Sequence, residues 1–202
     1  MKKIVLAAAL IVAGSTATFA QTSNTSSANA TLNVLVSNVK SISVSSGSTV
    51  NINLDNTQKF TNAAGATGVD GDVMSTLDVV SNGAYKVNVS LAGGETSLKN
   101  TNNNATGITT ISAGNIYLAV SNPRQITVGS TAPSATFSAT GQNLINTSNS
   151  LIATPAAMAG NGNAGTSGTK YDVTYTLANF ANVASLATGT FTATVVYTIT
   201  DL

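Results

Sequence analysis

Three segments of the chain alternate between apolar and polar side chains, at residues 85–91, 170–177 and 191–200, with Val196 as the one exception. Successive side chains of a strand point to opposite faces, so each segment predicts a strand with one buried and one solvated face. Such strands are typical of antiparallel sheets, and together they favour an all-β chain. The apolar positions are Tyr85, Val87, Val89 and Leu91 in the first segment, Tyr171, Val173, Tyr175 and Leu177 in the second, and Phe191, Ala193, Val195, Tyr197 and Ile199 in the third.

Shorter segments rich in β-branched residues predict further strands. They lie at residues 32–36, 40–45, 49–54, 76–80, 115–120, 125–128 and 134–139, and residues 144–152 are ambiguous. Ser81-Asn82-Gly83 and Ser121-Asn122-Pro123 are expected to form turns between neighbouring strands. About nine or ten short strands predict a single antiparallel β-sandwich of Greek-key or immunoglobulin-like type over residues 30–202, with a Greek-key barrel as the alternative.

Three stretches rich in Gly, Asn, Ala and Ser are expected to form long loops between these strands. They are Asn56–Ser75, Ala92–Gly107 and Pro155–Thr169. Residues 178–187 could hold one or two helical turns, with Phe180, Val183 and Leu186 on one side.

The first twenty residues have the features of a secretory signal peptide that is cleaved from the mature chain. Lys2 and Lys3 precede a short apolar run, and Thr18-Phe19-Ala20 supplies small residues at a cleavage site. Residues 21–29 follow as a flexible polar leader. The apolar run is too short to span a bilayer, and no later stretch approaches the length needed, so no integral membrane segment is expected. The sequence therefore predicts an exported protein at the cell surface, in the periplasm or outside the cell.

Few residues carry charge. Charged residues make up 7% of the chain, and removal of Lys2 and Lys3 leaves six basic against seven acidic residues, a net charge of about −1. Nucleic-acid partners need clustered Lys and Arg, so none is expected. A surface of Ser, Thr, Asn and Gly is suited to contact with copies of itself, with cell wall or with surface glycan.

The chain lacks most of the residue types and motifs that common enzymes use for catalysis. The chain has no Cys and no His, which excludes disulfides and the common His-dependent triads. Glu95 is the single Glu, so a glycosidase pair would need it or scattered Asp residues. Neither a nucleophile elbow nor a phosphate-binding loop is present. We expect a non-enzymatic protein without a cofactor.

Asp70, Asp72 and Asp78 are the weak candidates for a metal site, because calcium prefers carboxylate oxygens. Their spacing does not match the calcium loop of an EF-hand, and no Glu is near to bind in a bidentate manner. A solvated turn is the preferred interpretation, and no metal site is expected.

The C-terminus, ATGTFTATVVYTITD over residues 187–201, resembles the closing strand of the WxL domain family, with Tyr197-Thr198-Ile199 where the family has Trp-x-Leu. Upstream, LDVVSNGAYKV over residues 77–87 resembles the second motif region, with Tyr85-Lys86-Val87 in the corresponding place. The Lys-Lys signal peptide followed by Gln21 is also similar to those of exported proteins of Bacteroidetes.

This resemblance implies a β-sandwich with both motif strands in the core and non-covalent attachment to bacterial cell walls. Tyr85, Val87, Tyr197 and Ile199 would then be motif positions with mainly structural roles. Loops such as Ala92–Gly107 would be the contact surfaces.

Two hypotheses for function follow. The first is a non-catalytic envelope or surface protein, a WxL-like module that binds or coats. The alternative is a fimbrial or pilus-like subunit. In that case Ala28–Val36, an alternating segment behind the polar leader, would add as a strand to a neighbour's sheet. An ordinary first strand within its own domain is the simpler interpretation of the same segment.

Overall fold

The computed structural model describes residues 32–35, 39–81, 83–102, 104–126, 136–137, 142–144, 150–153 and 168–202. It divides the chain into two units, residues 1–36 and residues 37–202. The expected signal peptide, the polar leader and most of Pro155–Thr169 lie outside the described residues. Among the residues described, no helix is long and apolar enough to cross a membrane.

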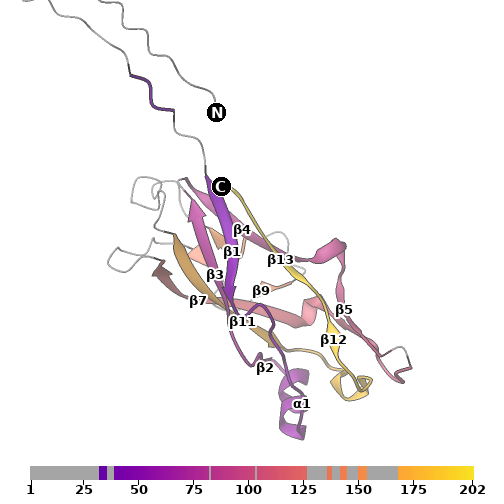
Figure 1. Ribbon diagram of the computed structural model, residues 1–202. Helices are drawn as coiled ribbons and strands as arrows, with labels where there is room; N and C mark the ends of the chain where they lie inside the picture. The colour runs from indigo at the N-terminus through magenta and orange to yellow at the C-terminus, as the bar shows by residue number, and fades with distance from the viewer. Residues whose placement is uncertain are drawn as a thin grey trace, which may run out of the picture. The chain divides into compact units, whose positions relative to one another are not determined.

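The second unit is mostly β, with antiparallel sheets and one short α-helix (Figure 1). The first sheet holds, in spatial order, β1 (Lys40–Ser46), β3 (Ser75–Ser81), β11 (Thr169–Leu177), β7 (Ile116–Gln125) and β9 (Gln142–Asn143), and β2 (Val69–Asp70) also pairs with β11. The second sheet has the order β13 (Val195–Asp201), β4 (Tyr85–Leu91), β10 (Ile152–Ala153) and β8 (Thr136–Phe137). The third sheet has the order β12 (Phe191–Thr192), β5 (Ser97–Asn100) and β6 (Thr110–Ser112).

The core forms where the predicted alternation is strongest. In β4 and β11 the predicted apolar positions are all buried, and they share one hydrophobic cluster with residues of β3 and β7. The predicted strands at 40–45 and 76–80 are confirmed as β1 and β3. Val183 is buried in a single 3-10 turn, Val183–Ser185, and Phe180 and Leu186 are half-buried beside it, which confirms the turn expected there.

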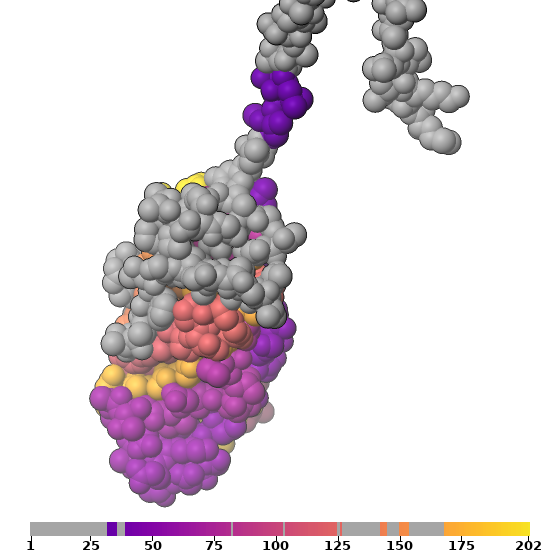
Figure 2. Space-filling view, turned by 90° about the vertical axis from the view of Figure 1, so that its left-hand side faces the viewer, coloured from indigo at the N-terminus to yellow at the C-terminus, as the bar shows by residue number. Residues whose placement is uncertain are grey.

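Two of the expected long loops contain regular structure. Asn56–Ser75 holds helix α1 (Thr57–Ala64) and β2, and Ala92–Gly107 holds β5 after a 3-10 turn, Ala92–Gly94. The Asn56 side chain caps α1 by accepting a hydrogen bond from the Lys59 N–H at 2.9 Å, and Ala63 is buried. Helix α1 and its neighbouring segments make up one end of the unit (Figures 1 and 2).

The expected turn at Ser121-Asn122-Pro123 is wrong, because β7 continues through it to Gln125. The register shows why: Ser121 pairs with Asp172 and Arg124 pairs with Lys170, so Asn122 and Pro123 together lie opposite one residue. Asn122 adopts a φ of 52° at this bulge. A β-bulge is a place where a strand tolerates proline, since the extra residue is not in the hydrogen-bond ladder.

The remaining corrections concern the edges of the sheets. Residues 49–54 form no strand, although their backbone pairs at one point through Asn51 and Asp72. The predicted strand 191–200 is two strands, β12 and β13, separated at Ala193-Thr194, and its apolar face is half-buried rather than buried. In the first unit residues 32–35 form no strand, and Leu32, Val34 and Leu35 are 87%, 76% and 93% exposed.

Candidate functional site

The four predicted motif positions come together on one face of the second sheet. β4 supplies Tyr85 and Val87, and its antiparallel neighbour β13 supplies Tyr197 and Ile199. Val87 pairs directly with Ile199 across the two strands. Tyr85 and Val87 belong to the buried core cluster, and Tyr197 and Ile199 are half-buried and pack against it.

Two tyrosine pairs connect this face to the first sheet. The hydroxyls of Tyr85 and Tyr171 lie 2.9 Å apart in the buried core, and those of Tyr175 and Tyr197 form a second, partly buried hydrogen bond. Both partners, Tyr171 and Tyr175, are on β11. A buried hydroxyl requires a hydrogen-bond partner, and here each tyrosine provides one for the other.

Burial keeps the hydroxyls of Tyr85, Tyr171 and Tyr197 protonated. Loss of solvation raises the pKa of Tyr85, Tyr171 and Tyr197 above the ordinary tyrosine value, because the phenolate cannot be hydrated in the core. The motif tyrosines are therefore neutral packing groups that join two sheets.

The outward face of the first sheet carries a network of charged and polar side chains. The Lys170 ammonium donates to both carboxylate oxygens of Asp78 at 2.6–2.7 Å, and Ser45 donates to the same carboxylate at 2.6 Å. Burial acts to raise the pKa of Asp78, but the hydrogen bonds from Lys170 and Ser45 outweigh it and lower that pKa. These residues connect β1, β3 and β11.

A second carboxylate extends the network to the β7 bulge. Asp172 is buried and accepts two hydrogen bonds from the Arg124 guanidinium, at 2.7 and 2.9 Å. Thr76 and Asn122 donate to it as well, at 3.0 and 2.8 Å. The guanidinium is the main cause of the lowered pKa of Asp172. Because both oxygens already have donors, Asp172 is a structural anion rather than a free base.

The three weak metal candidates have different partners. Asp70 accepts a hydrogen bond from Thr176, Asp78 belongs to the network above, and hydrogen bonds from Asn51 lower the pKa of Asp72. Within the described ranges, the structure has no group of three His, Cys, Asp or Glu side chains that could hold a metal ion.

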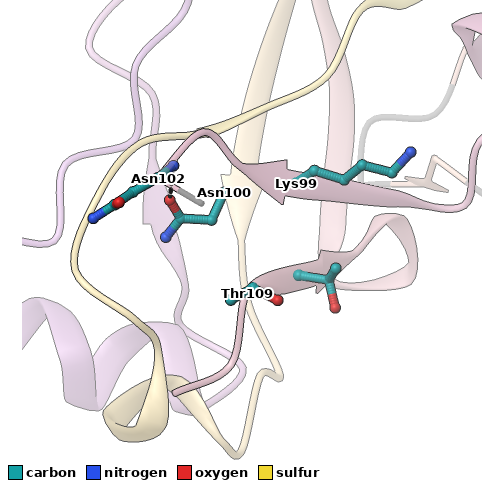
Figure 3. A pocket seen from close by; sticks show the side chains of 5 residues that line it. Lys99, Asn100, Asn102 and Thr109 are labelled. Carbon is teal, nitrogen blue, oxygen red and sulfur yellow. Dashed lines mark hydrogen bonds between the residues drawn. The ribbon is translucent and has the colours of Figure 1, made fainter. Parts of the chain in front are cut away.

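The third sheet carries a shallow hollow of about 310 Å³, lined by Lys99, Asn100, Asn102, Thr109 and Thr110. Asn100 and Asn102 lie together, joined by a hydrogen bond from the Asn102 N–H to the Asn100 side chain, while Lys99 extends away from them (Figure 3). Part of the hollow falls in Ala92–Gly107, where contact surfaces were expected. Its amides and hydroxyls can bond to a neutral polar ligand, although no lining residue offers an aromatic platform.

The sequence did not predict which strands form the edges of the first two sheets. β1 ends the first sheet and β13 ends the second, and an ion pair between Lys40 and Asp201 joins the start of one strand to the end of the other. The alternating faces of these strands were predictable, but their position at the edges was not.

Comparison with known proteins adds no relative to this description: no family model matches the chain, and no curated protein matches it either.

Proposed function

We propose that the chain is an exported, non-catalytic module of the cell envelope or cell surface, built as a β-sandwich, that acts by coating or by binding. The observation that carries this proposal is that its buried tyrosine and carboxylate side chains are hydrogen-bonded to other residues of the chain. The motif tyrosines bond to tyrosines, and the buried carboxylate of Asp172 is fully occupied by donors.

The sandwich form is supported by contacts between the sheets. Tyr85 and Tyr197 come from the second sheet and meet Tyr171 and Tyr175 of the first. Facing sheets that share one core are the basis of that architecture. The resemblance to the WxL domain suggests cell wall or surface glycan as the ligand, and the neutral surface fits such a partner.

The direct test measures binding of the purified exported protein to isolated cell walls and to extracted surface glycans. We expect the protein to sediment with one of them, and Asn100→Ala with Thr110→Ala to reduce binding, because these side chains line the hollow. Asn62→Ala, on helix α1, is the control that should bind as well as the parent. Binding to neither material would contradict the wall- or glycan-binding part of the proposal.

A second candidate function, a filament subunit that assembles by strand addition, is favoured by one observation. Two sheet edges, β1 and β13, lie next to each other and lack charged residues along most of their length. Proteins normally protect such edges against pairing with other chains.

A further inference from the structure

β1 and β13 define an open seam, a name used here for the line along which the edges of the first and second sheets meet. Among the described residues, β1 pairs only with β3, and β13 pairs only with β4. The two strands meet where Lys40 pairs with Asp201, near the C-terminus, and separate toward their other ends (Figure 1).

The open seam lacks the usual protection of sheet edges. Residues 41–46 of β1 and 195–200 of β13 include no charged residue and no proline. Lys40 and Asp201, the charged residues of these strands, lie at the closed end and neutralise each other. Lysines, prolines and inward-pointing charges are the features that normally prevent an edge from accepting another strand.

The seam also leaves part of the core incompletely covered. Ile42 on β1 and Val195, Tyr197 and Ile199 on β13 are only half-buried, and Val44 is 41% exposed. The corresponding positions of β4, one strand further in, are at most 4% exposed. An added strand with apolar side chains on one face would cover this rim and gain about 25 cal/mol for each Å² of apolar surface removed from water.

The chain contains a segment of matching chemistry outside the compact unit. Ala28–Val36 places Ala28, Ala30, Leu32, Val34 and Val36 at alternate positions, and no charged residue occurs between Gln21 and Val39. Nine extended residues span about 30 Å, enough to follow a seven-residue strand of about 23 Å. Leu32, Val34 and Leu35 are largely exposed, so these apolar side chains have no cover of their own.

We propose that Ala28–Val36 of one copy adds as a strand along the open seam of the next copy. The segment is assigned to a second copy because the Lys40–Asp201 ion pair closes the seam at the end where residues 37–39 join the same copy's segment to β1. A contact between different surfaces of successive copies generates a filament when its rotation does not close into a ring.

This inference rests on the second candidate function. The first test compares unboiled and boiled samples of the purified exported protein on a denaturing gel. We expect a ladder that collapses to one band on boiling. Leu32→Glu combined with Val34→Glu should reduce the assembled fraction at least about tenfold, since two charges would have to enter the apolar rim. Asn33→Glu is the matched control: it places the same charge on the opposite face and should keep the ladder.

Cysteine cross-linking identifies the copy that supplies the strand, because the chain has no cysteine of its own. Asn33→Cys combined with Thr198→Cys, treated with a short bismaleimide, should give covalent ladders. A cross-linked monomer would mean that each copy closes its own seam, and would overturn the proposal. A monomeric parent protein, or a ladder that survives the double Glu substitution, would overturn it as well. Binding of such a monomer to cell walls would leave the leading function intact.

Discussion

At the scale of single residues, tyrosines join the two main sheets through hydrogen bonds inside the core. The chain has five tyrosines and no tryptophan, and four of the five form the two hydroxyl pairs that join the sheets. Each pair satisfies two polar groups inside an apolar cluster, so a pair contributes as a unit rather than as two independent residues.

Removal of one hydroxyl should therefore destabilise the protein by more than half of the stability that the pair contributes, because the other hydroxyl loses its partner. We expect Tyr171→Phe to lower the free energy of unfolding by about 1–3 kcal/mol, because the Tyr85 hydroxyl loses its buried partner. Tyr85→Phe combined with Tyr171→Phe should cost less than the sum of the single changes. Urea unfolding of the four proteins measures the coupling, and strictly additive costs would contradict a shared hydrogen bond.

The raised tyrosine pKa values predict a loss of stability at alkaline pH. A tyrosine in the unfolded chain ionises near pH 10, whereas burial raises the pKa of Tyr85, Tyr171 and Tyr197 in the folded protein. Above about pH 10 the unfolded state binds fewer protons than the folded state, so the tyrosine contribution to stability is constant below about pH 10 and falls above it. Thermal unfolding at several pH values measures this, and a Tyr→Phe variant should show a shallower decline.

At the scale of elements, the bulge in β7 is held by one carboxylate. Asp172 lies opposite the bulge and receives Arg124 and Asn122 from it. The Asp172 side chain is 9% exposed and that of Arg124 is 39% exposed. The arginine therefore matters mainly as the partner of a buried charge.

Arg124→Ala should destabilise the protein by about 1–2 kcal/mol, because Asp172 keeps only its two neutral donors. The effect should shrink as the pH falls through the lowered pKa of Asp172, where the carboxyl becomes neutral in both proteins. Lys59→Ala is the control, since it removes an exposed ion pair with Asp55 and should change stability little. Equal effects of the two variants would argue against a special role for Asp172.

Strand prediction succeeded where alternation and burial coincide, as in β4 and β11. It failed where a local feature outweighed composition. An Asn cap started a helix in a segment whose Gly and Ala content favoured a loop, and a bulge let Pro123 remain in a strand. Periodicity gives the faces of a strand but not its neighbours, so the half-buried face of β13 could not be inferred.

At the scale of the whole molecule, low charge separates this chain from proteins that assemble by ionic contact. Apart from the Lys40–Asp201 pair at its closed end, the seam is uncharged, and so is the proposed docking segment Ala28–Val36. Salt therefore has few charge–charge contacts to screen at this interface. We expect the ladder to persist from about 50 mM to about 500 mM NaCl, measured by sedimentation or gel. Dissociation at the higher concentration would indicate an ionic interface in another place.

The candidate site was only partly accessible from the sequence. The motif positions were named from the resemblance to the WxL domain, and the structure places them on two neighbouring strands, where they lie in the core or pack against it. The Asp172 network and the seam depend on which distant strands become neighbours, and alternation alone carries no such information. Arg124 and Asp172 are 48 positions apart, and nothing local connects them.

The network on the outer face of the first sheet also has a consequence for correct pairing. Strands built from repeated Ser and Thr with alternating apolar residues could slide by two positions and still present the right face to the core. Lys170 lies directly opposite Asp78, and Arg124 reaches Asp172, so a slide would separate both charge pairs. Because the chain has few charges, these two ion pairs favour the native strand register over registers shifted by two residues.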